Sequence, residues 1–231
     1  MCIKEINIAK DLINADYVGP IPLDDESPKI MENFSSRQER LDYAINLLKK
    51  YNTPQSRYYL CEAYHNSNVS RRKESIDVFL KYLSNELYKD VIGKIDPGAI
   101  SLYKMSYFDA MNFHIATVLS WLGEAYEGEY DYENALLAFK KSYSLAPYFS
   151  GAPGQVSRIY MKMNRIDKSI EVLEKYKTTR WYAPYDEKTY SGNVYHHDDN
   201  KVLVDEWIDD YKKKIERGYV FRPRKRKSKK R

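Results

Sequence analysis

Apolar residues recur at helical spacing in several separate stretches of the chain, and the clearest stretch spans residues 116–147. Its first half places Leu122 and Tyr126 on one face, and its second half places Leu136 and Phe139 on one face. A short acidic turn separates the two halves. The pattern therefore predicts two amphipathic helices whose apolar faces pack against each other.

The same pattern returns 34 residues later, and an earlier copy has a turn that is two residues longer. Small residues at Gly123 and Ala135 let neighbouring helices approach closely, and Phe139 fills the gap between them. The matching positions are Val156, Ser157, Tyr160, Ser169, Ile170 and Leu173 in the later copy, and Leu60, Cys61, Tyr64, Ser75, Ile76, Phe79 and Tyr82 in the earlier one.

Helix–turn–helix units with this period and these small residues resemble tetratricopeptide repeats. The resemblance is most specific over 116–149. It is weaker over 150–179, where Pro153 lies in the first helical turn, a place that tolerates proline. The earlier unit spans about 54–83. The resemblance implies an all-α fold, an antiparallel helix-pair solenoid, because three units are about the minimum that buries a common core.

The segments around the repeats complete the predicted organisation. The repeats are unevenly spaced, so we expect an inserted connector at 83–110 and a lengthened first helix in the second repeat. Ser36 and Glu39 form a capping-box pattern that predicts a helix over 36–51. The predicted divisions are an irregular N-terminal arm (1–35), one helical domain (36–217) that ends in a capping helix (199–217), and a flexible basic tail (218–231).

The resemblance implies a concave wall lined by the first helix of each pair, where a protein or peptide partner would bind. A co-chaperone carboxylate clamp is absent, because the places of its basic and amide side chains hold Tyr58, Glu62, Ser120 and Glu124. The twelve groove positions are Gln55, Tyr58, Glu62 and His65 in repeat one, Thr117, Ser120, Glu124 and Glu127 in repeat two, and Gly151, Gly154, Arg158 and Lys162 in repeat three.

Charge is distributed unevenly along the chain. The net charge is +5, yet the last ten residues hold eight basic side chains and no acid, which leaves a balance of −3 elsewhere. The tail could bind nucleic acid without reading its sequence, serve as an import signal in a eukaryotic cell, or only aid solubility. Its basic residues are Arg222, Arg224, Lys225, Arg226, Lys227, Lys229, Lys230 and Arg231.

Catalytic and metal-binding patterns are weak in this sequence. No glycine-rich phosphate loop, nucleophile elbow or HExxH motif occurs. The run from His196 to Asp199 offers four potential ligands, but adjacent side chains diverge and rarely meet at one ion. Two cysteines cannot form a disulfide framework. We therefore expect no catalytic residue, no metal and no cofactor.

No apolar run approaches the roughly 18 residues of a membrane span, and the N-terminus does not resemble a secretory signal. We expect a cytoplasmic protein, or a nuclear one in a eukaryote. The favoured interpretation is a non-catalytic scaffold. Two alternatives remain: a nucleic-acid-associated protein that acts through residues 222–231, and a helical accessory of a family-2 glycosyltransferase system, whose repeat extensions have a similar order of elements.

Overall fold

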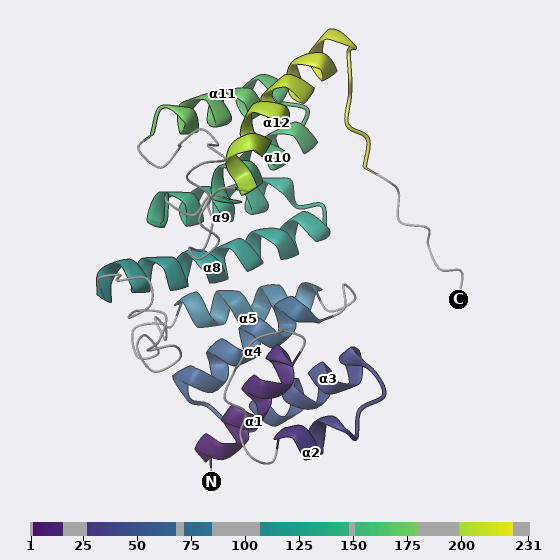
Figure 1. The fold of residues 1–231 in the computed structure, drawn as a ribbon, viewed down its shortest axis with the longest axis vertical. Helices are drawn as coiled ribbons and strands as arrows, with labels where there is room; N and C mark the ends of the chain where they lie inside the picture. Colours follow the sequence, from purple (N-terminus) through teal and green to yellow (C-terminus); the bar gives the residue numbers. More distant parts are fainter. Residues whose placement is uncertain are drawn as a thin grey trace, which may run out of the picture. The chain divides into compact units, whose positions relative to one another are not determined.

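The computed structural model describes residues 2–15, 27–67, 72–84, 107–147, 151–179 and 199–223. All elements in these ranges are helices, so the all-α prediction is confirmed (Figure 1). The chain divides into two compact units, Met1–Glu129 and Tyr130–Arg231. The sequence interpretation assigned residues 36–217 to one domain, whereas the structure divides that range between two units.

The first unit contains six helices within its described residues, and consecutive helices pack on each other from α3 onward. Its core is apolar, with Leu41, Ile45 and Phe79 almost completely buried. The helices are α1 (Cys2–Asn14), α2 (Ser27–Met31), α3 (Arg37–Leu48), α4 (Pro54–Asn66), α5 (Arg72–Ser84) and α8 (Tyr107–Gly128).

The N-terminal segment is helical, and the prediction of an irregular arm over 1–35 is wrong for α1 and α2. Helix α1 packs on both α3 and α4. It buries Ile6, Ala9 and Leu12, and the buried carboxylate of Asp11 accepts a hydrogen bond of 2.7 Å from the hydroxyl of Ser27. Ile6, Ala9, Leu12 and Ile13 recur at helical spacing in this stretch, a signal that the sequence interpretation did not use.

The predicted helix after Ser36 is present as α3, but its capping differs from the prediction. The Ser36 hydroxyl accepts a hydrogen bond of 3.2 Å from the Glu39 main-chain N–H. The Glu39 carboxylate accepts bonds from the main chain and hydroxyl of Ser35 instead of returning to Ser36. A reciprocal capping box lies at the start of α4, between Thr53 and Ser56.

The connector predicted at 83–110 lies mostly outside the described residues. Helix α5 ends at Ser84, and α8 begins at Tyr107. Helix α8 has 22 residues, whereas α4 has 13, which confirms the lengthened first helix of the second predicted repeat.

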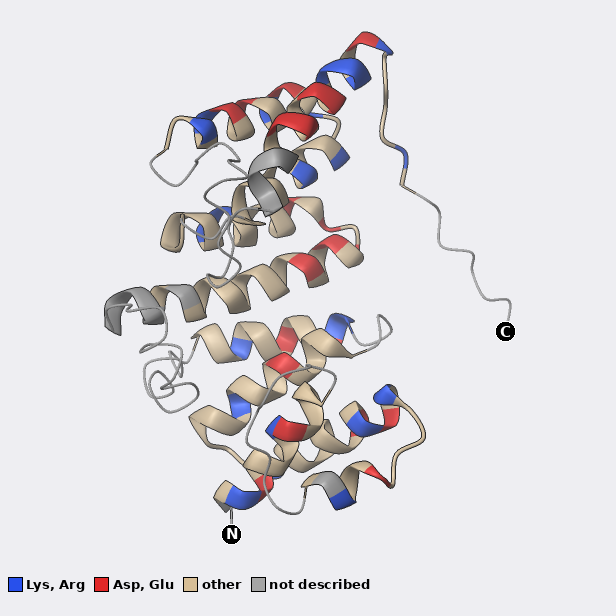
Figure 2. Ribbon diagram, viewed as in Figure 1, with Lys and Arg blue, Asp and Glu red and all other residues tan. Residues whose placement is uncertain are grey.

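The second unit packs its described helices in chain order. Helix α10 packs on α9 and α11, and α12 packs on α11, as a capping helix should. Ile166, Leu173, Tyr176, Val204 and Ile208 form the core that joins α11 to α12. Figure 2 shows acidic residues along α12 and a basic turn near its end. The helices are α9 (Tyr132–Leu145), α10 (Gly151–Lys162), α11 (Ile166–Lys177) and α12 (Asp199–Glu216).

The turns of the two later repeats have the same main-chain geometry 34 residues apart. Tyr130 has a φ of 66° and Asn164 a φ of 58°, both in the left-handed region. The residue before each of these two makes equivalent bonds. The Glu129 N–H donates to the carbonyls of Ala125 and Tyr126, and the Met163 N–H donates to the carbonyls of Ile159 and Tyr160. The period predicted from side chains is therefore present in the backbone.

The start of the C-terminal tail is attached to the second unit. Gly218 ends α12 with a φ of 62°, and Tyr219 N–H donates to the Lys214 carbonyl at 2.9 Å. Asn164 then makes two hydrogen bonds with the Phe221 main chain, at 2.5 and 3.2 Å. The prediction of a flexible tail from residue 218 is therefore wrong for residues 218–223, which we call the strap. Residues 224–231 lie outside the described residues.

Candidate functional site

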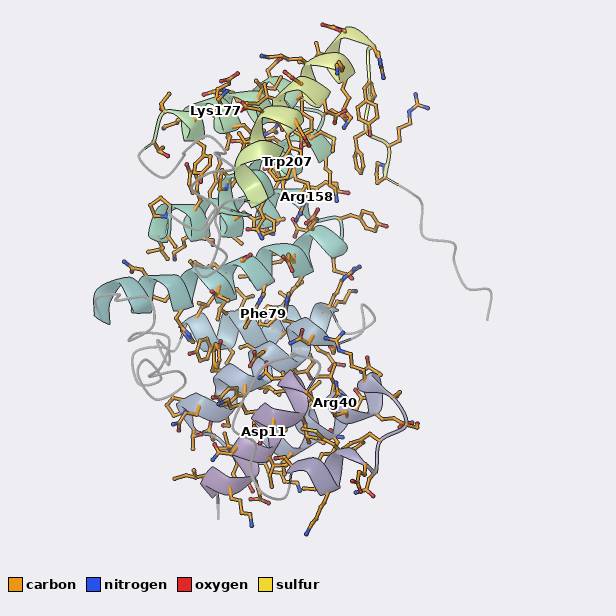
Figure 3. The ribbon with its side chains drawn as sticks, in the orientation of Figure 1. Asp11, Arg40, Phe79, Arg158, Lys177 and Trp207 are labelled. Atoms are coloured by element: carbon orange, nitrogen blue, oxygen red, sulfur yellow. The ribbon has the colours of Figure 1, made fainter. Side chains whose placement is uncertain are left out.

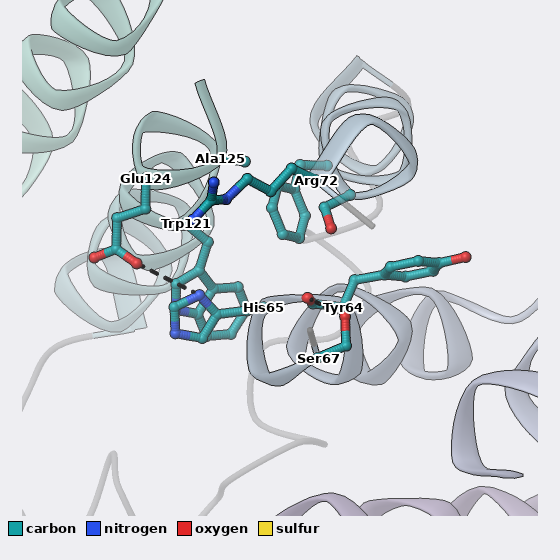
Figure 4. A pocket seen from close by; sticks show the side chains of 9 residues that line it. Tyr64, His65, Ser67, Arg72, Trp121, Glu124 and Ala125 are labelled. Carbon is teal, nitrogen blue, oxygen red and sulfur yellow. Dashed lines mark hydrogen bonds and ion pairs between the residues drawn. The ribbon is translucent and has the colours of Figure 1, made fainter. Parts of the chain in front are cut away.

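His65 and Glu124, two predicted groove positions from successive first helices, meet at the surface of the first unit. The His65 Nδ1 atom lies 3.6 Å from a Glu124 carboxylate oxygen. The imidazole stacks on the indole ring of Trp121, with centroids 4.9 Å apart and planes 18° from parallel. Figure 4 shows the carboxylate of Glu124 directed at this stack. Helices α4 and α8 thus bring together residues that are distant in sequence.

A cavity of about 160 Å³ lies beside this stack, and we call it the aromatic pocket. Its walls combine aromatic rings with a carboxylate, a guanidinium group and two hydroxyls. Phe79 is 1 % exposed and is packed into the core, so the pocket has a rigid base. The lining residues are Tyr64, His65, Ser67, Arg72, Ser75, Phe79, Trp121, Glu124 and Ala125.

Arg72 fixes the rim of the aromatic pocket to the end of α8. Its guanidinium donates a hydrogen bond of 2.9 Å to the Gly128 carbonyl. A side chain at residue 128 would overlap that guanidinium, since an added Cβ would lie 2.2 Å from Arg72 Nε. Glycine at this position therefore permits the contact.

His65 is neutral near pH 7. Partial burial, and to a smaller extent the positive charge of Arg37, together lower its pKa to about 4. The contact with Glu124 is thus between a neutral ring and a carboxylate at neutral pH, and it leaves the negative charge of Glu124 uncompensated by His65.

Tyr58, another predicted groove position, lies in a cluster of aromatic rings between α4, α5 and α8. Its ring centroid is 4.4 Å from His114 and 6.1 Å from Trp121. The Tyr82 hydroxyl is 2.8 Å from His114 Nε2. Burial raises the pKa of Tyr58 and lowers that of His114 to about 4. These side chains form packing between α4, α5 and α8.

Glu62, the next groove position of repeat one, faces α1. Burial raises the pKa of its carboxyl to about 7, although a hydrogen bond from Asn14 and the charge of Lys10 oppose that shift. The N-terminal helix, which the sequence interpretation missed, therefore covers this part of the wall.

The groove face of repeat three is covered by α12. The Trp207 ring lies so close to Gly154 that an added Cβ would be 2.6 Å from its Cζ3 atom. Figure 3 labels Trp207 and Arg158, which line a cavity of about 330 Å³ with Gly151, Gly154, Gln155 and Tyr211. The Arg158 guanidinium lies 6.0 Å above the Phe139 ring. The terminal helix thus closes over predicted groove positions.

The remaining predicted positions differ in their exposure. Ser120 is buried, with 5 % of its surface exposed. The side chains of Gln55, Thr117, Glu127 and Lys162 are half-buried. Arg222 is exposed on the strap, and the other seven tail cations lie outside the described residues, as do His196 and His197.

Comparison with protein families matches the tetratricopeptide repeat to residues 116–149 and 154–178. Repeats two and three of the sequence interpretation are thereby confirmed, and such repeats are built for binding other proteins. The earlier unit, at 54–83, lies outside the matched residues and stays a prediction, although α4 and α5 are present there.

One solved structure, titled "Crystal structure of MamA", is 17 % identical and aligns with a TM-score of 0.46 over 86 % of this chain and 98 % of that chain. A likeness at this level carries no inference about function. No curated protein matches the sequence. None of these findings supports a role beside a glycosyltransferase.

Two further observations concern only the part of the chain that the structure describes. None of its helices has the length and apolar character needed to cross a membrane. No group of three or more His, Cys, Asp or Glu side chains is placed to hold a metal ion. The Cys61 thiol is buried, and burial raises its pKa, so it packs between helices as the sequence predicted.

Sequence reasoning missed that the Trp121 and Trp207 rings lie beside predicted groove positions. Trp121 lies beside Ser120 and Leu122 on α8, one residue from a groove position of repeat two. Trp207 was recognised only as an apolar residue of the capping helix. A tetratricopeptide-repeat pattern assigns groove positions by register within each repeat. It contains no signal for a side chain that reaches a groove position from another helix.

Proposed function

We propose that this chain is a non-catalytic scaffold that binds a protein or peptide partner, and that the partner contacts the aromatic pocket of the first unit. The observation that carries the proposal is the stack of His65 on Trp121 beside Glu124, at the mouth of a cavity of about 160 Å³. The other groove positions with clear surroundings are covered: Glu62 by α1, and Gly154 by α12.

The chemistry of the pocket suits an apolar anchor side chain that is flanked by polar groups. The half-buried Trp121 ring and the exposed His65 ring provide aromatic surface over the buried Phe79 side chain, and aromatic side chains often contribute most of the energy of an interface. The Glu124 carboxyl group lies at the rim, 3.6 Å from His65 Nδ1, and can accept a hydrogen bond from a partner. We therefore expect a partner segment with one apolar anchor and a hydrogen-bond donor beside it.

The test is a paired capture experiment with the full-length chain. Immobilised wild-type protein and a Glu124→Lys variant are exposed to the same extract, and retained proteins are quantified. Glu206→Lys, an exposed change of the same charge on α12, is the matched control. We expect a protein that is retained by the wild type and the control and reduced at least about tenfold by Glu124→Lys, because a charge is reversed at the pocket rim. Equal retention by both variants would contradict the proposal.

A second measurement addresses the non-catalytic part of the proposal. Purified protein is incubated with nucleotide sugars, and release of free sugar or nucleotide is followed over time. We expect no turnover above the buffer blank, since the sequence contains no phosphate-binding loop, nucleophile elbow or HExxH motif. Hydrolysis that copurifies with the protein would overturn this part.

A further inference from the structure

The positive charge of the chain begins before the tail, within α12. Residues 212–231 contain twelve Lys or Arg side chains and one acid, Glu216, whereas residues 1–211 contain 26 basic and 32 acidic side chains. The net charge is therefore −6 for residues 1–211 and +11 for residues 212–231. Figure 2 shows the basic turn near the end of α12, directly before the strap.

The first part of this region is held in a defined place on the second unit. The Asn164 carboxamide bonds the Phe221 main chain in both directions, and the Phe221 ring packs edge-on against Tyr132 at 6.2 Å. The Lys214 ammonium lies 5.6 Å above the Tyr219 ring. These contacts fix the strap without covering its outer side chains.

Three cations among the described residues of this region are exposed and form no ion pair with another described residue. Lys213, Arg217 and Arg222 are exposed, and none of them forms a salt bridge to a residue that the structure describes. Lys212 and Lys214 do pair, with Glu174 at 3.7 Å and Asp210 at 2.5 Å. Lys213, Arg217 and Arg222, which pair with no acid among the described residues, are therefore the side chains best placed to bind an external anion.

Apolar surface is interleaved with these cations. Tyr219 is 40 % exposed and Val220 is 57 % exposed on the strap. A base can stack on an exposed tyrosine ring, and such stacking tolerates any base because each has a flat face. Residues 222–231 contain no aromatic residue, so the stacking surface that the tail lacks is supplied by the strap.

We propose that residues 212–222 form a binding element for single-stranded nucleic acid, in which Lys213, Arg217 and Arg222 neutralise phosphates and Tyr219 stacks on a base. This activity goes beyond the partner binding of the aromatic pocket, which lies in the other unit. The simpler alternative, that the lysines only complement the C-terminal end of the α12 dipole, explains Lys213 but not the exposed cations and rings beyond Gly218.

The test measures binding of full-length protein to a labelled single-stranded oligonucleotide by fluorescence anisotropy over a salt series. The variant Lys213→Ala/Arg217→Ala/Arg222→Ala is compared with Lys50→Ala/Lys73→Ala/Lys141→Ala, which removes the same charge from exposed sites elsewhere. We expect the first variant to lower the slope of log affinity against log salt by about 2, because each phosphate contact to a single strand contributes about 0.7. The control triple should keep the wild-type slope.

Tyr219→Ala separates base stacking from simple polyanion binding, with Val220→Ala as its control. We expect Tyr219→Ala to weaken oligonucleotide binding about tenfold and to leave binding of inorganic polyphosphate unchanged. The proposal would be overturned if the two triple variants lowered the slope of log affinity against log salt equally, or if the wild-type protein did not bind the oligonucleotide at low salt. Unchanged oligonucleotide binding by Tyr219→Ala would also overturn it and would assign the region to polyanions in general.

Discussion

The indole of Trp207 occupies the space that a side chain at Gly154 would need. A Cβ built on Gly154 would lie 2.6 Å from Cζ3 and 2.9 Å from Cη2 of that ring. The Trp207 ring can therefore pack in its observed position against α10 because residue 154 has no side chain. The glycine, which normally weakens a helix interior, is explained here by this close approach.

Gly154→Ala should destabilise the protein by about 1–3 kcal/mol, because the indole must move out of a packed position. The same change in a Trp207→Ala background should be neutral or stabilising by about 0.5–1 kcal/mol, since alanine favours the helix more than glycine does. Urea denaturation of the four variants measures both values. A stabilising Gly154→Ala in the wild-type background would show that the ring does not fill this space.

The small-residue positions of repeat three provide a second prediction. Ser157 and Ser169 are completely buried, and their hydroxyl oxygens lie 2.7 Å apart. The Ser157 hydroxyl also lies 3.0 Å from the Ser169 carbonyl, and the Ser169 hydroxyl lies 2.7 Å from the Ser157 carbonyl. Because each hydroxyl has one hydrogen, one serine donates to the other hydroxyl, and the second donates to a carbonyl. In repeat two the same positions hold Gly123 and Ala135, which have no hydroxyl.

Replacing one serine by alanine should cost about 1 kcal/mol, and replacing both should cost less than the sum of the two single changes. The reason is that the second change removes a hydroxyl that has already lost one partner. Ser157→Val should cost about 2 kcal/mol or more, because added methyl groups would separate α10 from α11. Chemical denaturation of the variants gives these differences. Strict additivity of the alanine changes would contradict the mutual hydrogen bonding.

Much of the repeat architecture could be predicted from the sequence, because small and large apolar residues recur with a fixed period. Gly123, Ser157, Ala135 and Ser169 are positions where a larger side chain would hold two helices apart. The pattern fixed the helices of repeats two and three to within a few residues. Packing of α8 against α9 is a relation between the two units and stays a prediction.

The site was predicted less completely. The position of a residue within a repeat indicates whether it faces the groove, but it does not indicate which helix from outside the repeat packs over that residue. His65 and Glu124 were named as groove positions, and the structure brings them together. Glu62 and Arg158 were named on the same grounds, yet α1 lies over the first and α12 closes beside the second. The apolar residues of α1 do recur at helical spacing, but the sequence interpretation treated residues 1–35 as an irregular arm and did not use that signal.

Helix α1 packs over Glu62, and this leads to a prediction of how the stability of the protein depends on pH. The pKa of this carboxyl is about 7 in the folded protein, against an ordinary value of 4.5. The folded state thus binds the proton more tightly than the unfolded state. Its contribution to stability is greatest below pH 4.5 and is lost as the pH rises through 7.

Glu62→Gln should therefore stabilise the protein at pH 8 by about 1–3 kcal/mol and change its stability little at pH 4.5, since the amide mimics the protonated carboxyl. Glu206→Gln, at an exposed position on α12, is the control and should have little effect at either pH. The free energy of unfolding is measured by urea titration at both pH values. An equal effect of Glu62→Gln at pH 4.5 and pH 8 would contradict the buried position of this carboxyl.

The most direct test of the proposed scaffold is oxidative footprinting of the full-length protein, alone and with the partner retained in the capture experiment. The two indole rings provide an internal comparison, because Trp121 borders the aromatic pocket and Trp207 is packed against Gly154. The account predicts that the partner lowers the oxidation rate of Trp121 at least about threefold, as expected for a buried anchor site, and leaves Trp207 unchanged. Protection of Trp207 with no change at Trp121 would contradict it.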